Sequence, residues 1–350
     1  MFNKEALQTL YGNHQETLEK MVALETELKG RFYGMDATVE CMMLAALTGE
    51  PMVMIGPPGT AKSRLIRSFC NLMGLIDDDA LTTSGAGGTD AIRGERYFEY
   101  LLTQFTEPSE LFGYYDLARL FAAENREFIR DSTGMMQKAE VVFLDEVFNA
   151  SSAILNALLT FMNERKFHDR GEVQRVPMKL LFAASNHPPL EDGLGAVYDR
   201  FLLRSRVRNV APDAERLAEL VSVAWRETHA TPGAVGHDYS DLLERLDQYR
   251  GSIDDMTKAG ELTVQETDPL FWKLADLVTE LRRKDLSEMS NRRLVKFTGV
   301  IMANALLRAA RAGRPKPTIE PADLAVILNF GLDSEDESTV RKQTEHLLQS

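Results

Sequence analysis

Residues 53–66, VMIGPPGTAKSRLI, place a lysine, a hydroxyl and two glycines at a spacing suited to phosphate chemistry. They nearly match the phosphate-binding loop G-x-x-x-x-G-K-[ST], in which main-chain N–H groups at a helix start point at an anion. Lys62 would then reach the β- and γ-phosphates of a nucleotide, and the Ser63 hydroxyl would ligate Mg²⁺. The predicted ATP-binding residues are Gly56, Pro57, Pro58, Gly59, Thr60, Ala61, Lys62, Ser63 and Arg64. The alternative is a strand–turn–helix connection without a ligand.

Ala61 departs from the pattern, which has its second glycine at this position. Glycine is required where φ must be positive or where the backbone touches a ligand. Position 61 lies at the predicted helix entrance, where we expect a negative φ that alanine adopts easily. We therefore interpret the departure as tolerable.

Polar residues end two further apolar runs. Asp145 and Glu146 close VVFLDE, and Asn186 closes LLFAASN. One carboxylate is predicted to hold Mg²⁺, together with Ser63, while the other orients an attacking water. The Asn186 amide can hydrogen-bond a γ-phosphate and that water. The alternatives are a strand cap for the acidic pair and an Asx turn before the prolines for Asn186.

Strands and helices alternate up to about residue 208, and helices follow. We predict strands over 51–55, 98–105, 139–147 and 179–186, helices over 1–30, 36–50, 63–73 and 152–165, and a hairpin around Asp169–Gly171. This order predicts an α/β fold, with a parallel sheet covered by helices on both faces and an all-α region after it. Ligands bind at the carboxyl ends of such strands, where Gly56, Asp145–Glu146 and Asn186 fall.

The composition is that of a soluble globular chain, with 44% hydrophobic residues and a net charge of −13. This charge argues against a broad nucleic-acid footprint, which needs clustered Lys and Arg. The two cysteines, Cys41 and Cys70, have no metal-ligand spacing and are expected to be buried thiols, so we expect a cytoplasmic protein. We expect neither a signal peptide nor a membrane span.

The order GPPGTAKS, VVFLDE, FAASN, YDRFLLR and SNRR resembles the MoxR group of AAA+ ATPases, and the RavA branch in particular. The resemblance covers about residues 15–332, and RavA-like loops carry the same alanine before lysine. It implies Asp145 as the magnesium residue of Walker B, Glu146 as the catalytic glutamate and Asn186 as sensor 1. It implies Arg200 as the arginine finger, with Arg204 and Arg206 as rivals, and Arg292 as sensor 2, with Arg293 as the alternative.

The resemblance also implies a nucleotide-binding core over residues 1–211, a helical lid over 212–333 and a tail over 334–350. It places an insert at 114–134 and a hairpin at 165–177, both facing a pore. RavA-type proteins carry a further domain after the lid, so we expect that domain's functions to be absent or supplied otherwise. The acidic and Gly-rich loop 76–98 is longer than expected, and we have no physical account of it.

The resulting functional prediction is a ring-forming, hexameric ATPase. It would use Mg²⁺ and ATP to remodel a protein client together with a von Willebrand A partner. Phe121, Phe128 and Ile129 of the insert are candidate client contacts. The first alternative is a nucleic-acid motor, for which the hairpin supplies Arg165, Lys166, Arg170 and Arg175. The second is a nucleotide-gated scaffold that hardly turns over, against which Glu146 argues.

Overall fold

The computed structural model describes residues 1–77, 92–93, 95–116, 129–169, 172–189, 194–229 and 237–333. The chain forms two compact units. One comprises Val53–Phe201 and Val207–Asn209, and we call it the sheet unit. The other comprises Met1–Met52, Leu202–Arg206 and the chain from Val210 onward, and we call it the helical unit.

The sheet unit is built on parallel strands. Its strands follow the order β2-β3-β4-β7-β1. β3, β4 and β7 are parallel, with Leu101 opposite Asp145, whereas β2 pairs with β3 in the antiparallel sense. The strands are β1 (Met52–Ile55), β2 (Ile92–Arg93), β3 (Tyr97–Leu101), β4 (Val141–Asp145) and β7 (Leu180–Ser185). The predicted α/β fold with a parallel sheet is confirmed.

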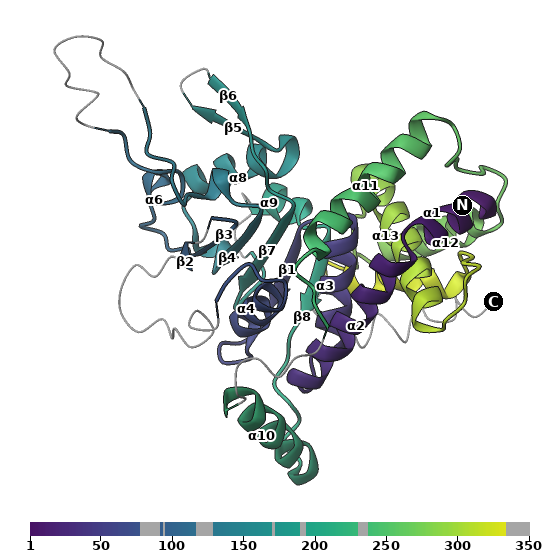
Figure 1. The fold of residues 1–350 in the computed structure, drawn as a ribbon, viewed down its shortest axis with the longest axis horizontal. Helices are drawn as coiled ribbons and strands as arrows, with labels where there is room; N and C mark the ends of the chain where they lie inside the picture. The colour runs from purple at the N-terminus through teal and green to yellow at the C-terminus, as the bar shows by residue number, and fades with distance from the viewer. Residues whose placement is uncertain are drawn as a thin grey trace. The chain divides into compact units, whose positions relative to one another are not determined.

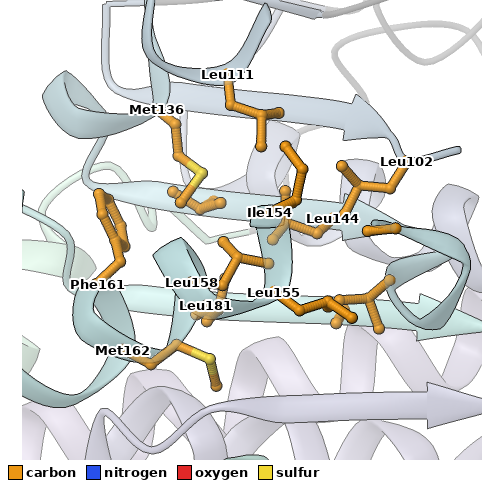
Figure 2. Close-up of a cluster of buried hydrophobic side chains, with 14 of the residues drawn as sticks. Leu102, Leu111, Met136, Leu144, Ile154, Leu155, Leu158, Phe161, Met162 and Leu181 are labelled. Carbon is orange, nitrogen blue, oxygen red and sulfur yellow. The ribbon is translucent and has the colours of Figure 1, made fainter. Parts of the chain in front are cut away.

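Alternate residues of each strand pack on opposite faces of this sheet. On one face, Leu144 and Leu181 pack with Leu158 of α8 (Ser152–Glu164) in a buried hydrophobic cluster (Figure 2). On the other face, Phe182 meets Phe69 of α4 (Lys62–Leu72) edge to face, with ring centroids 5.5 Å apart. Helices therefore cover both faces, and packing on both sides holds the strand ends at which the sequence predicted a ligand.

Strand β3 ends earlier than the sequence predicted. The prediction ran to Phe105, but the strand stops at Leu101, because Thr103 and Thr106 form a turn. The Thr106 N–H donates to the Thr103 carbonyl at 3.1 Å, and the Thr103 N–H donates to the Thr106 hydroxyl at 2.9 Å. Helix α6 (Pro108–Phe112) follows with a capping box. The turn leaves Phe105 with 80% of its surface exposed.

A hairpin and the base of the predicted insert extend from the sheet unit. The predicted hairpin is confirmed as β5 (Lys166–Asp169) and β6 (Glu172–Arg175), which project beyond α8 (Figure 1). Tyr115 and Arg130 bridge the base of the predicted insert, and the Arg130 guanidinium lies 4.1 Å from the Tyr115 ring centroid. Gly113 is required there, because its φ is +89° and a Cβ would lie 1.9 Å from the Asp131 carbonyl oxygen.

Several predictions lie outside the described residues. These are most of the loop 76–98, the insert residues Phe121 and Phe128, the hairpin residues Arg170 and Gly171, and the tail 334–350. Short elements complete the sheet unit: η1 (Met136–Lys138), η2 (Val147–Asn149) and α9 (Gly195–Arg200).

The helical unit combines both ends of the described chain. Its helices are α1 (Lys4–Asn13), α2 (Gln15–Arg31), α3 (Asp36–Thr48), α10 (Ala214–His229), α11 (Leu242–Lys258), α12 (Leu270–Arg283), α13 (Asn291–Arg311), η4 (Pro321–Leu324) and α14 (Ala325–Phe330). Strand β8 (Leu203–Arg206) also belongs to it. Helix α3 ends at Thr48, two residues before the end of the predicted helix, and left-handed Gly49 follows it. Within the described part of the chain, no helix has the length and apolar character needed to cross a bilayer.

The contact-based units and the predicted domains divide the chain differently. Residues 1–52 join the C-terminal helices by contacts, whereas the prediction assigned residues 1–211 to the nucleotide-binding core. The functional boundaries at 211 and 333 stay a prediction. The two cysteines are free thiols and are buried, Cys41 in α3 and Cys70 in α4, as expected.

Candidate active site

The predicted phosphate-binding loop connects β1 to α4 in the sheet unit, so the strand–loop–helix context is confirmed. The Gly56 N–H donates to the Ser185 carbonyl at 3.1 Å. A Cβ on Gly56 would lie 2.1 Å from the Val207 carbonyl oxygen, so only glycine fits. Gly59 has a φ of +80°, which explains why a glycine occupies position 59 of the loop.

The expectation of a negative φ at Ala61 is wrong. Ala61 has φ 61° and ψ 22°, in the left-handed region, directly before the first residue of α4. The loop must reverse here to enter the helix, and this requirement overrides alanine's own preference for the right-handed region. A left-handed conformation costs a non-glycine residue about 1–2 kcal/mol. The loop therefore carries strain at the position where its usual motif has glycine.

Lys62 is buried inside the loop, with 6% of its surface exposed. Its ammonium donates to the carbonyls of Gly56 at 2.6 Å and Pro57 at 3.0 Å, and to Oδ1 of Asn186 at 3.3 Å. Burial lowers the pKa of Lys62, and the carboxylates of Asp145 and Glu146 oppose that shift. All three hydrogen-bond acceptors are neutral, so an anionic phosphate would compete well for this cation.

Ser63 and Asp145 place two oxygen atoms side by side, in a donor set that would suit a magnesium ion. The Ser63 hydroxyl, in the first turn of α4, donates to Oδ2 of Asp145 at 2.7 Å. Main-chain pairing fixes Asp145 at the end of β4, and its carbonyl accepts from the Leu102 N–H at 2.8 Å. Mg²⁺ prefers hard oxygen ligands and is often held by one or two protein groups plus substrate phosphates. A hydroxyl beside a carboxylate fits that donor set.

Glu146 follows Asp145 in a left-handed conformation, with φ 52° and ψ 42°. This backbone turn separates the directions of the two adjacent carboxylates. The Glu146 carboxylate accepts from the Asn186 side-chain amide through a short hydrogen bond, and from the Asn186 N–H at 3.4 Å. Burial raises the pKa of Glu146, as does Asp145, whereas the Asn186 N–H, Lys62 and His187 oppose the shift.

Asn186 therefore bridges two charged groups at the end of β7. Its Oδ1 accepts from Lys62, and its Nδ2 donates to Glu146. These contacts fix the orientation of the amide. The side chain that the sequence predicted to touch a γ-phosphate thus lies between the lysine predicted to bind phosphate and the candidate base.

The predicted arginines differ in their surroundings. Arg200 ends α9 in the sheet unit, and its side chain is 24% exposed and lies 3.4 Å from Asp199. The rivals Arg204 and Arg206 belong to the helical unit. Arg204 is 3% exposed and donates to the Asp333 carboxylate, and Arg206 donates to the Asp333 carbonyl at 3.3 Å.

Arg292 and Arg293 begin α13 in the helical unit. Arg293 is 2% exposed, and its guanidinium donates to Asp333 Oδ1 at 3.1 Å and to the Gly331 carbonyl at 2.6 Å. Arg292 is partly exposed. Burial and ion pairing give Arg204 and Arg293 a structural environment, which favours Arg200 and Arg292 among the predicted candidates.

Sequence reasoning missed one polar group at the site. Nδ2 of Asn149 donates to Oε2 of Glu146 at 3.2 Å. Asn149 also lines a cavity of about 780 Å³ together with Glu146, Thr103 and Phe105. A polar residue shortly after a strand-end carboxylate was the available signal, but it is equally typical of a turn.

A family model matches residues 19–83 and 89–247, which is more than half of the chain. It is described as the MoxR domain of MoxR–vWA–β-propeller ternary systems. The match includes the loop at 56–63, the acidic pair and Asn186. The matched region therefore covers the sheet unit except residues 84–88, and the part of the helical unit that lies between residues 19 and 247.

Curated relatives match more than half of the chain. Two uncharacterised proteins of Methanocaldococcus jannaschii are each 36% identical, over 59% and 57% of this chain and 49% and 48% of their own lengths. Chaperone MoxR1 of Mycobacterium tuberculosis is 26% identical over 57% of this chain and 46% of its own length. The chain thus spans about half the length of these relatives.

One solved structure shares the fold over nearly the full length. It comes from Cytophaga hutchinsonii, is described as a candidate ATPase, and has a TM-score of 0.61 at 16% identity, covering 98% of this chain and 97% of that one. At this identity the likeness concerns the fold alone. The fold, the phosphate-binding loop and the family match agree: the chain belongs to the MoxR family of AAA+ ATPases.

Proposed function

We propose that this protein hydrolyses ATP with Mg²⁺. The observation that supports this most is the meeting of three strand ends in the sheet unit, where Lys62, the Ser63–Asp145 pair and the Glu146–Asn186 pair lie in hydrogen-bond contact. When bound, Mg²⁺ would neutralise charge on the phosphates. Ser63 and Asp145 would hold that ion.

The residues of the loop would have different roles in binding phosphate. Pro57 and Pro58 have no N–H, so they shape the loop without donating to the nucleotide. The donors would come from Gly59 to Ser63, at the positive end of the α4 dipole. Thr60 steadies the loop, since its hydroxyl donates to the Pro57 carbonyl at 2.9 Å. Arg64 lies in the first turn of α4 and completes the proposed binding set.

Glu146 would act as the general base for the attacking water, and Asn186 would orient that water and contact the γ-phosphate. Burial favours the neutral acid, so Glu146 is a stronger base than an exposed glutamate. In the arrangement described here, its carboxylate is engaged by Asn186. Binding of a phosphate to Lys62 would remove the Lys62–Asn186 hydrogen bond and let the amide turn.

We further propose a homo-oligomeric ring, most simply a hexamer. In it, Arg200 reaches the nucleotide of a neighbouring subunit, whereas Arg292 contacts the nucleotide of its own subunit. Charge on the transferring phosphate is then stabilised from both sides. The partial exposure of Arg200 supports this assignment over the buried Arg204.

The proposed work of the ring is chaperone-like remodelling of a protein client with a von Willebrand A partner, close to the RavA branch and in the cytoplasm. Support comes from the family description, which names vWA and β-propeller systems, and from MoxR1, which is named a chaperone. Exposed Tyr114 and Ile129 at the insert base and Val173 on the hairpin offer apolar contacts to a client.

The alternative, a nucleic-acid motor, receives less support. In the hairpin, Arg165 donates to the Met178 carbonyl at 2.5 Å, and Lys166 lies 3.4 Å from Glu164. These cations are therefore partly engaged within the protein, and the net charge of −13 repels phosphate at long range.

The test compares Mg-dependent ATP turnover of the purified chain with that of Glu146→Gln. We expect turnover in the first and a loss of about 10²-fold or more in the second, with nucleotide binding retained. Adding a vWA partner or double-stranded DNA in separate arms distinguishes the two functions. Stimulation by DNA alone, with binding that weakens steeply in salt, would establish the motor instead.

A further inference from the structure

Two asparagines on different elements hold the Glu146 carboxylate. Asn186, at the end of β7, binds it through both its side-chain amide and its N–H. Asn149, at the end of η2, donates Nδ2 to Oε2 at 3.2 Å. Asn186 has a second task, because its Oδ1 accepts from Lys62. Asn149 has no part in the phosphate-binding loop, so the proposed roles leave its contact with Glu146 unexplained.

The turn that carries Asn149 is fixed by packing. Glu146 enters η2 in the left-handed conformation, and the Asn149 N–H donates back to the Glu146 carbonyl at 2.9 Å. Between them, Val147 is fully buried, and the Phe148 ring meets Tyr198 and Phe201 edge to face at 5.7 and 6.2 Å. The Asn149 amide is therefore presented to the carboxylate from a rigid support.

Asn149 also lies on the solvent side of Glu146. Its side chain is exposed and lines the cavity of about 780 Å³ that is also lined by the Thr103–Phe105 turn. Glu146 lines the same cavity. The Asn149 hydrogen bond thus adds a second restraint on this carboxylate, from an element other than the one that carries Asn186.

We propose that Asn149 is a positioning residue for Glu146 in ATP hydrolysis. When Asn186 turns toward a bound γ-phosphate, Asn149 keeps one carboxylate oxygen engaged, so that the other oxygen faces the attacking water. This inference rests on the proposed ATPase function. One hydrogen bond of this kind contributes about 0.5–1.5 kcal/mol, so its loss lowers turnover by about 2- to 12-fold.

The experiment measures kcat and KM for Mg-ATP, nucleotide Kd by calorimetry, and Tm. In Asn149→Ala we expect kcat to fall about 3- to 10-fold, with KM, Kd and Tm unchanged. Asn149→Gln keeps the donor and should recover at least half of the turnover. Asn149→Asp keeps the shape, loses the donor and adds a repelling charge, so its kcat should be no higher than that of the alanine variant.

The matched control is Gln104→Ala, which removes an exposed amide from the same cavity and should leave kcat unchanged. A kcat in Asn149→Ala within twofold of wild type would overturn the inference. A rise in kcat would overturn it too, because Asn149 would then hold Glu146 in an unproductive position. If Asn149→Ala has a lower Tm than wild type, the kcat of the isosteric Asn149→Asp variant is used to test the inference instead. If wild type shows no turnover above Glu146→Gln, the proposed function itself fails, which this comparison separates from failure of the inference.

Discussion

The sheet unit and the helical unit both bury positive charge, but they hold it in different ways. In the sheet unit, the Lys62 ammonium donates to two carbonyls and one amide oxygen, all neutral. In the helical unit, the guanidinium groups of Arg204 and Arg293 donate to the carboxylate of Asp333. Each of these three cations is no more than 6% exposed.

This difference distinguishes the proposed binding cation, Lys62, from the two structural cations, Arg204 and Arg293. A buried charge whose hydrogen-bond acceptors are all neutral keeps much of its desolvation cost, which nearby Asp145 and Glu146 offset only in part, so the lysine gains most from an arriving anion. A buried charge that already has a carboxylate gains little from a phosphate and loses its partner if it moves. The type of acceptor, and not burial alone, therefore separates the lysine of the loop from the arginines around Asp333.

The largest expected effect is the loss of nucleotide binding in Lys62→Ala. Removing the cation leaves the phosphates facing a loop of dipoles only, so we expect ATP affinity to fall by more than about 10³-fold, corresponding to roughly 4 kcal/mol. Titration calorimetry with ATP measures this, with Glu146→Gln as the matched variant that keeps affinity. Equal affinity in wild type and Lys62→Ala would contradict the comparison directly.

The second prediction concerns Arg200, the partly exposed arginine at the end of α9. Arg200→Ala should lower turnover by about 10³-fold by analogy with arginine fingers, and activity per subunit should rise with protein concentration in the wild type. Mixing Arg200→Ala with Lys62→Ala chains should restore part of the activity, since some interfaces then pair an intact finger with an intact loop. A specific activity that stays constant on dilution would argue against a finger supplied by a neighbour.

The third prediction concerns Asp333. Asp333→Ala removes the carboxylate between two buried guanidinium groups, which should lower the free energy of unfolding by about 3 kcal/mol. This is the low end of the usual range, because Asp333 is 32% exposed. Chemical denaturation measures the change, and ATP affinity of the folded protein should stay the same. Asp333→Asn is the isosteric control and should be milder. An affinity loss without destabilisation would assign the cluster to the binding site.

The smallest expected effect is at Ala61. Ala61→Gly relieves a left-handed alanine and should stabilise the protein by about 1 kcal/mol or less, because the unfolded chain gains flexibility at the same time. The matched reverse change is Gly59→Ala, where φ is +80° and no atom lies within 4 Å of the new Cβ. That variant should be destabilised by conformation alone. Thermal unfolding of both variants tests whether strain is specific to position 61.

Local patterns account for what the sequence predicted well. The loop, its flanking strand and helix, helix α8 and the hairpin each depend on residues close together in the chain. The sign of φ at Ala61 was missed because the path of the loop, and not alanine's own preference, determines it. The extent of β3 was missed because apolar Leu102 and Phe105 extend a strand pattern beyond the turn.

Long-range contacts explain the remaining gaps. Arg204 and Asp333 are 129 residues apart, so no local pattern could assign Arg204 to a structural cluster before the fold was known. The contact between Asn149 and Glu146 spans only three residues, but it depends on a left-handed turn that propensities do not predict. Three strand-end motifs could be placed at one sheet edge, whereas the hydrogen bonds among them could not.

The two cysteines provide a built-in probe of each unit. Cys41 belongs to the helical unit and Cys70 to the sheet unit, and burial raises the pKa of both thiols well above its usual value. A neutral, buried thiol is inert to alkylating reagents until its surroundings open. The rate at which each cysteine is modified, resolved by peptide mass spectrometry, therefore reports the opening of one unit independently of the other, in the unmutated protein and with or without nucleotide.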